Sequence, residues 1–189
     1  MSPPRLFLIA LLALGLAACS TPARHYYILS AESPMPSGGG KGIGLGPIAL
    51  AGHLDRPNLV IQETPESLGI AESHHWGGSL EQNISRALAT DLGRALHTGF
   101  VLTYPWSNDA GLTYQIAVDI HHFEGDPQGN AVLDATWRVY SLPDRGMVAT
   151  RSWSGKEPQL TDGYDALVAA ESKLLGRLAR EIASSLHSS

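Results

Sequence analysis

A single cysteine, Cys19, directly follows an apolar run that begins at Leu6, and no other feature constrains the chain more strongly. Arg5 places a positive charge ahead of the run, which ends in small residues, as in a bacterial export signal. The run is shorter than the roughly 20 apolar residues that a membrane-spanning helix needs. With one cysteine, no disulfide can form within the chain. We therefore expect residues 1–18 to be a signal peptide.

Residues 16–19, with the sequence LAAC, resemble the lipobox of bacterial lipoproteins, in which the cysteine is diacylated and becomes the new N-terminus. Each buried methylene adds about 0.8 kcal/mol to membrane attachment, and two chains anchor stably where one does not. A covalent lipid on Cys19 would anchor the mature chain without spanning the membrane. Ser20 stands where an aspartate would favour the inner membrane, so we expect the outer membrane. The alternative is a secreted protein with a free thiol.

The composition favours one acidic globular domain. The formal net charge is −5, and removal of residues 1–18 makes it more negative, so a basic nucleic-acid-binding footprint is absent. Hydrophobic residues make up 43% of the chain and charged residues 16%, which is ordinary for a globular protein. We expect residues 19–25 to form the lipidated cysteine and a short tether. Residues 26–189 then form a single periplasmic domain held close to its membrane.

Two stretches have the periodicity of amphipathic helices. Between residues 80 and 96, apolar residues recur at intervals of three and four, with charged residues mostly off this stripe. Ser79, followed by Gln82, fits a capping box at the start of this helix, and Gly99 is expected to stop it. A second helix is predicted from residue 161 or 162 to about residue 186.

Short alternating runs predict a sheet. Residues 112–123 and 131–140 alternate apolar and polar side chains around a turn-rich segment, which is typical of an antiparallel hairpin. The order of elements is compatible with both helices packed on one face of the sheet. We therefore predict an α+β fold, a mostly antiparallel sheet with two amphipathic helices packed on one face. The other expected strands are residues 25–30, 43–50, 59–62, 100–103 and 147–154.

The sequence contains few motifs for metal binding or catalysis. His74–His75 and His121–His122 are the obvious metal candidates, because imidazole is the commonest metal ligand. Neighbouring residues of a regular strand point to opposite faces, so His121 and His122 should not converge on one ion. A glycine-flanked nucleophile, a phosphate loop and a dinucleotide fingerprint are all missing from the sequence. We expect no enzyme, no catalytic residue, no metal, and no cofactor other than the lipid on Cys19.

The remaining motifs combine rigid turns with arginine and aromatic side chains, which concentrate at protein interfaces. Residues 54–57 have a simpler interpretation as a loop, in which the aspartate bonds nearby backbone and the proline directs the chain into the next strand. Trp106 is equally compatible with packing a strand end and with docking a partner. The candidate partner surface consists of Asp55, Arg56, Pro57, Trp76, Tyr104 and Trp106.

The motifs resemble, in their order, those of the PqiC family of ABC-type transport auxiliary lipoproteins, over nearly the whole mature chain. Two positions depart from the family pattern. Trp76-Gly77-Gly78-Ser79-Leu80 stands where a Trp-Ala-Glu-Pro-Leu-like segment is common, and His121 where arginine is frequent. The resemblance rests on the lipobox, YYIL, GPIAL followed by LDRPNLV, a tryptophan before the capped helix NISRALATDL, VLTYPW, and YQIAVDIHHFEGDPQGNAVLDATWRVY.

This resemblance implies a lipoprotein anchored in the outer membrane that faces the periplasm and serves an MCE-type ABC lipid transport system. The protein would be the docking or receiving component for lipid transfer between the inner and outer membranes. Its partners would be a periplasm-spanning MCE-type protein, the outer membrane through the acyl chains, and phospholipid. Self-association into a homo-oligomeric ring is one way for the protein to match the symmetry of a tube-shaped MCE protein assembly.

Two other hypotheses belong to different classes. A monomeric periplasmic lipid-binding carrier would use the apolar and aromatic content, and it needs a concave apolar cavity. A metal-dependent periplasmic hydrolase would use the histidine pairs, and it needs a bound metal.

Overall fold

The computed structural model describes residues 23–107 and 110–187, so the predicted signal peptide and Cys19 lie outside the described part of the chain. Within these residues, neither helix is both long enough and apolar enough to cross a membrane. The elements in chain order are β1 (His25–Tyr27), β2 (Ile43–Leu50), β3 (Asn58–Thr64), β4 (Ser67–Trp76), α2 (Leu80–Ala95), β5 (Val101–Thr103), β6 (Tyr114–Gly125), β7 (Asn130–Ser141), β8 (Gly146–Pro158) and α3 (Tyr164–His187).

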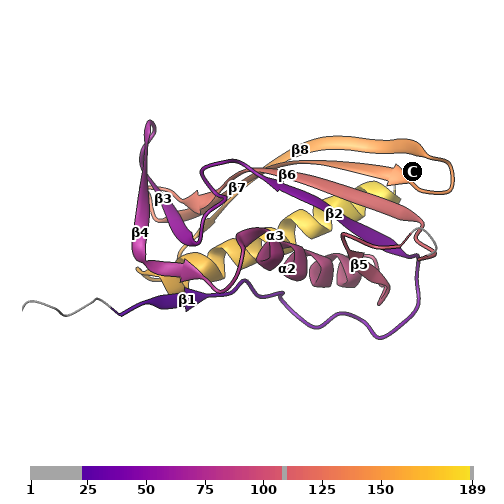
Figure 1. Ribbon diagram of the computed structural model, residues 1–189, viewed down its shortest axis with the longest axis horizontal. Helices are drawn as coiled ribbons and strands as arrows, with labels where there is room; N and C mark the ends of the chain where they lie inside the picture. Colours follow the sequence, from indigo (N-terminus) through magenta and orange to yellow (C-terminus); the bar gives the residue numbers. More distant parts are fainter. Residues whose placement is uncertain (1–22, 108–109, 188–189) are drawn as a thin grey trace, which may run out of the picture.

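Strand β6 is central to the curled eight-stranded sheet. On one edge it pairs antiparallel with β7, which pairs antiparallel with β8. On its other edge it pairs parallel with β2 and, near Gly125, with Ile61 of β3. Strand β5 adds to β2, while β4 and then β1 extend the sheet from β3. The β1–β4–β3 group turns away from the plane of the other strands at one end of the molecule (Figure 1).

The prediction of a mostly antiparallel sheet is wrong, although the α+β class fits. The pairs β1–β4, β2–β5, β2–β6 and β3–β6 are all parallel, and only three pairs are antiparallel. Alternation along a strand reports which side chains are buried, but not the direction of the neighbouring strand. Parallel neighbours need a long connection, and the chain between β2 and β6 contains α2.

Strand β4 was not predicted. Its side chains do not give a clean apolar face, because Leu68 and Ile70 are exposed while Ala71 and Trp76 are buried. It nevertheless pairs with β3 and receives β1, in register from His25 opposite His74 to Tyr27 opposite Trp76. The other strands lie within a few residues of their expected bounds; β8, for example, ends at Pro158 where residue 154 was expected.

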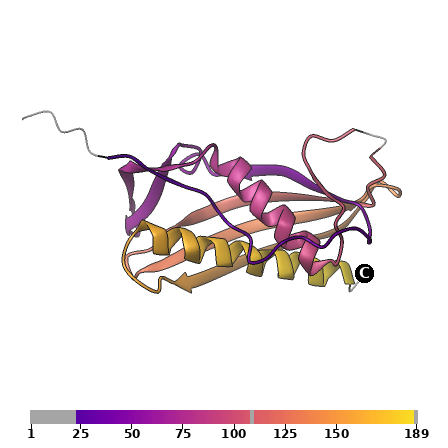
Figure 2. The ribbon, with the colours of Figure 1, turned by 90° about the horizontal axis from the view of Figure 1, so that it is seen from below.

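Both helices lie on the same face of the sheet and cross each other there (Figure 2). The predicted cap of α2 is confirmed, since the Ser79 hydroxyl accepts a hydrogen bond from the Gln82 amide at 3.1 Å. The helix does not end at Gly99: His97 adopts a left-handed φ of 53°, and the Thr98 amide donates to the Gly93 carbonyl. The core between helices and sheet contains Leu80, Ile84, Leu88 and Leu92 of α2, Leu167, Leu174, Leu175, Leu178 and Ile182 of α3, and Ile116, Val118, Ile120, Leu133, Trp137 and Val139 of the sheet.

The segment between β1 and β2 runs along the helices from one end of the molecule to the other (Figures 1 and 2). Leu29 anchors it in the core at 2% exposure. A Cβ on Gly99 would lie 2.5 Å from the Gly38 nitrogen and the Pro36 carbonyl oxygen. The close passage of this segment, and not the helix stop, therefore explains the glycine at position 99.

Candidate partner-binding surface

Tyr104 and Trp106 form an aromatic pair just after β5, with ring centroids 5.5 Å apart in an edge-to-face arrangement. Tyr104 is 59% exposed, whereas Trp106 is half-buried. The Tyr104 amide donates to the Leu45 carbonyl at 2.9 Å, which ties the pair to the first half of β2. Edge-to-face packing is the favoured geometry of two aromatic rings, so Tyr104 is presented in a fixed orientation.

Two glycines of β2 make room for this pair. Gly46 has a φ of 128°, and a Cβ there would lie 2.6 Å from the Tyr104 Cβ. A Cβ on Gly44 would lie 2.7 Å from the Trp106 ring. At both positions a side chain would displace the aromatic residue. The GLG sequence of β2 is therefore the local cause of where Tyr104 and Trp106 sit.

Two grooves flank the aromatic pair. One, of about 690 Å³, lies between α2 and the Tyr104–Pro105 turn, and its lining includes Glu81, Gln82 and Arg86. The other, of about 480 Å³, is lined by Trp106, Leu112, Leu142 and neighbouring residues. The first groove is polar and charged on its helix side. An exposed aromatic side chain beside such grooves can be covered by another protein.

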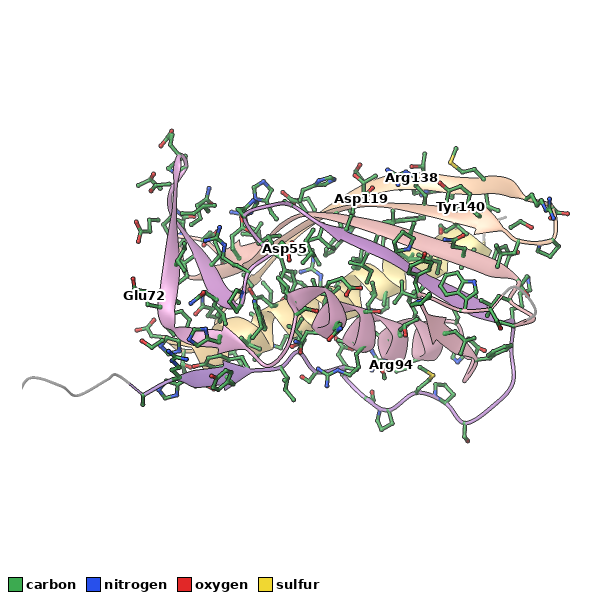
Figure 3. All side chains as sticks on the ribbon, in the orientation of Figure 1. Asp55, Glu72, Arg94, Asp119, Arg138 and Tyr140 are labelled. Atoms are coloured by element: carbon green, nitrogen blue, oxygen red, sulfur yellow. The ribbon has the colours of Figure 1, made fainter. Side chains whose placement is uncertain are left out.

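The loop between β2 and β3 carries the other predicted residues (Figure 3). Asp55 and Pro57 are exposed, and Arg56 is half-buried, with its amide donating to the Leu54 carbonyl at 2.8 Å. This loop follows the end of β2, whereas Tyr104 packs near its middle and Trp106 near its start. The structure therefore places the two predicted groups apart along β2.

Trp76 does not belong to a partner surface. It is 4% exposed, and its ring centroid lies 6.3 Å from that of Phe123 in the core. The sequence alone does not show which way the side chain points, and in the structure it belongs to the hydrophobic core. It is a packing residue.

The sequence analysis missed a second set of exposed apolar residues. Tyr26 and Ile28, in and just after β1, are 65% and 58% exposed, and Leu68 and Ile70 of β4 are 42% and 49% exposed. The signal was present in the run YYIL, in which only Tyr27 and Leu29 turn toward the interior. These residues lie at the end of the molecule from which the chain leads back toward Cys19 (Figure 1).

Charged side chains fix the segment that joins the two ends. Glu32 accepts hydrogen bonds from Arg94 of α2 at 2.6 Å and from Arg180 of α3 at 2.9 Å. Partial burial alone would raise the pKa of Glu32, but these two guanidinium groups hold it below its ordinary value. Asp91 is 1% exposed, and burial raises its pKa despite the hydrogen bond from the Glu32 amide.

The histidine pairs have different surroundings. His74 accepts or donates a hydrogen bond with the Tyr27 hydroxyl at 2.8 Å and stacks on Tyr164 with centroids 3.8 Å apart. His121 contacts the Thr136 hydroxyl at 3.0 Å. Of these four histidines, only His122 belongs to a group of potential metal ligands among the described residues, and its companions are His53 and Glu124 rather than His121.

The amino-acid sequence is similar to those of known proteins over most of its length. Residues 27–183 match the sequence profile of a family described as the ABC-type transport auxiliary lipoprotein component. The chain is 24% identical, over 168 residues, to the intermembrane transport lipoprotein PqiC of Escherichia coli strain K12, covering 86% of this chain and 87% of that protein. The same identity and coverage hold for PqiC of Shigella flexneri.

Solved structures share the fold. An uncharacterized protein superposes with a TM-score of 0.75 at 21% identity, covering 87% of this chain and 99% of that chain. A protein from Xanthomonas campestris superposes with a TM-score of 0.63 at 18% identity, covering 86% of this chain and 97% of that chain. At these identities the superpositions speak for the fold alone.

Proposed function

The chain belongs to the family of ABC-type transport auxiliary lipoprotein components, and from this premise we propose that it is a docking or receiving subunit for lipid transfer between the two membranes. The family description names a transport component and no catalysed reaction. In this proposal, acyl chains on Cys19 hold the domain at the periplasmic face of the outer membrane. A periplasm-spanning MCE-type protein is the partner, and several copies of the chain assemble around its end.

The observation that carries the proposal is the separation of two exposed aromatic regions. Tyr26 and Ile28 lie in and just after β1, at the end of the molecule where the described chain begins, and Tyr104 follows β5, which lies away from that end (Figure 1). A short tether brings the first region close to the membrane surface. The second region then points toward the periplasm, where a partner can reach it. Two such regions are what an adaptor between a membrane and a protein needs.

The PqiC relatives support the lipid part of the proposal. Their name describes intermembrane transport lipoproteins, and phospholipid is the cargo that would pass between two membranes. The monomeric carrier remains the alternative. A carrier needs an apolar pocket that buries most of its ligand, whereas the groove beside Tyr104 is open and lined by Glu81, Gln82 and Arg86. This favours an adaptor over a carrier.

The proposal is tested by affinity purification of the lipidated chain from native membranes in mild detergent. We expect an MCE-type protein to co-purify, and native mass spectrometry of the same sample to give a defined oligomer. A Cys19→Ser variant, which cannot be acylated, is the control and should lose its membrane fraction. Recovery of a monomer with bound phospholipid and no MCE-type protein would support the carrier and overturn the adaptor.

A further inference from the structure

The strand β6 contains an irregularity that gathers two polar residues on its outer face. The register between β6 and β7 shifts between Ile120 and His122, so that Ile120 opposes Ala135 and His122 opposes Asp134. Ile120 and Phe123 are both buried in the core, and the bulge leaves His121 and His122 exposed. A bulge breaks the strict alternation of side chains. His122 therefore faces outward together with Glu124, two residues further along.

A third residue reaches this place from the β2–β3 loop. Ligand atoms of His53, His122 and Glu124 all lie within 4.8 Å of one another. The His122 Nδ1 and the Glu124 Oε1 are 2.6 Å apart, and the His53 Nε2 lies 3.7 Å from the Glu124 Oε2. Asp119 and Arg138, which are ion-paired at 2.7 Å, lie on the side of the sheet away from the helices (Figure 3).

Two of the three side chains place ligand atoms in the protein interior. Glu124 is 2% exposed although it is a carboxylate, and a buried charge is costly unless it is paired and hydrogen-bonded. Its Oε2 accepts from the Phe123 amide at 2.6 Å. The His53 Nε2 is itself buried and has no hydrogen-bond partner among the described residues. Asp134, opposite His122, also has a buried oxygen without such a partner.

We propose that His53, His122 and Glu124 bind a Zn²⁺ ion, through one imidazole nitrogen each and the carboxylate. Two imidazoles and one carboxylate form a ligand set that Zn²⁺ uses, at about 2.0–2.2 Å from each atom. Around a tetrahedral ion such atoms stand roughly 3.3 Å apart. His122 and His53 approach different oxygens of Glu124, at 2.6 and 3.7 Å, so the carboxylate must turn to present one oxygen to the ion. The ion takes the place of the hydrogen between the His122 Nδ1 and Glu124, and His122 binds it as a neutral imidazole whose one proton is carried by Nε2. A water completes the coordination.

The ion would clip the β2–β3 loop to the end of β6. His53 lies two residues before Asp55, so the clip would fix the loop that carries Asp55, Arg56 and Pro57. This inference does not depend on the lipid-transfer proposal. It also differs from the expectation drawn from the sequence, in which His121 and His122 were weighed as a pair without His53 or Glu124.

The test uses the mature lipidated chain in detergent, with an affinity tag that contains no histidine. The protein is stripped with EDTA and titrated with Zn²⁺ against a chromophoric competing chelator. We expect one Zn²⁺ per chain, with affinity reduced at least tenfold in His53→Gln and in His122→Gln. His121→Gln is the matched control, since His121 is the adjacent exposed imidazole, and it should bind as tightly as the wild type.

A second readout does not rely on variants that keep their fold. Co²⁺ added to the stripped wild-type protein should give a visible absorption band of a tetrahedral or five-coordinate site, which Zn²⁺ then displaces. Zn²⁺ should also raise the melting temperature of the wild type but not that of His122→Gln. The proposal is overturned by the absence of stoichiometric binding, or by equal losses of affinity in His121→Gln and His122→Gln.

Discussion

The two ends of the molecule expose aromatic side chains in different ways. At the tether end, Tyr26 lies on the three-residue strand β1, which pairs with β4, and its ring centroid is 5.6 Å from that of His75, with no glycine pocket around it among the described residues. Away from that end, just after β5, Tyr104 is held edge-on to Trp106 and against Gly46 of β2. A fluid membrane surface does not require a fixed side chain, whereas a protein partner binds a pre-organised anchor more tightly. The contrast supports the proposed membrane-facing and partner-facing roles.

The largest effect on this contrast is expected from Gly46→Ala. A side chain there meets the Tyr104 Cβ at 2.6 Å and adopts an unfavourable φ of 128°. Backbone strain and overpacking each cost about 1–3 kcal/mol, so the free energy of unfolding should fall by roughly 2–6 kcal/mol. Urea unfolding measures this loss.

Gly129→Ala is the matched control for that prediction. Gly129 also has a positive φ, of 78°, but a Cβ there would have no atom within 4 Å. Only the backbone strain applies, and the loss should be about 1 kcal/mol. Equal losses in the two variants would show that Tyr104 is not held by its contact with Gly46.

Tyr104→Ala should weaken binding to the proposed MCE-type partner at least tenfold, about 1.4 kcal/mol. Because Tyr104 is 59% exposed, the variant should melt near the wild-type temperature. Binding is measured by surface-immobilised lipidated protein against the detergent-purified partner. Tyr26→Ala is the control at the other end, and a similar loss in that variant would remove the distinction between the two ends.

The double variant Tyr26→Ser/Ile28→Ser should weaken membrane contact without affecting the partner. Both side chains are more than half exposed, and burying apolar side chains at a lipid interface contributes to binding. The effect is measured in a Cys19→Ser background, so that acyl chains do not mask it, by sedimentation with phospholipid vesicles. We expect binding to fall several-fold, with Tyr104→Ser in the same background leaving it unchanged.

The smallest effect concerns Glu32, which ties the segment between the two ends to both helices. Its pKa is lowered in the folded protein, so its contribution to stability is present above its unfolded value near 4.5 and is lost as the pH falls through the folded value. The stability difference between wild type and Glu32→Gln should therefore be greatest at pH 7 and shrink below pH 4.5. Thermal melts across this range measure it, and a difference that grows on acidification would contradict the assignment.

Local features of the fold could be read from the sequence, because local forces determine them. The Ser79 cap and the apolar stripes of both helices follow from residues three and four apart. Strand direction could not be read, since alternation in β6 and β7 does not reveal the direction of the neighbouring strands. Strand β4 was missed because Leu68 and Ile70 are apolar but exposed.

The candidate sites show the same limit. The residue types predict Tyr104 and Trp106 as candidate partner residues, but Gly44 and Gly46, which position them, act through a pairing of distant segments. Trp76 is buried, although its residue type favours the candidate surface, because a tryptophan can also fill the core. The group around His122 depends on a bulge and on a loop far away in the sequence. The expectation that neighbouring residues point to opposite faces holds only for regular strands, so it does not predict this group.

The most direct test of the account compares the two ends in one experiment. A photo-reactive phenylalanine analogue is placed at position 104 or at position 26 of the lipidated protein, which is then irradiated in its native membranes. The account predicts a crosslink to an MCE-type protein from position 104, and adducts with lipid from position 26. A crosslink to the MCE-type protein from position 26, with none from position 104, would contradict it.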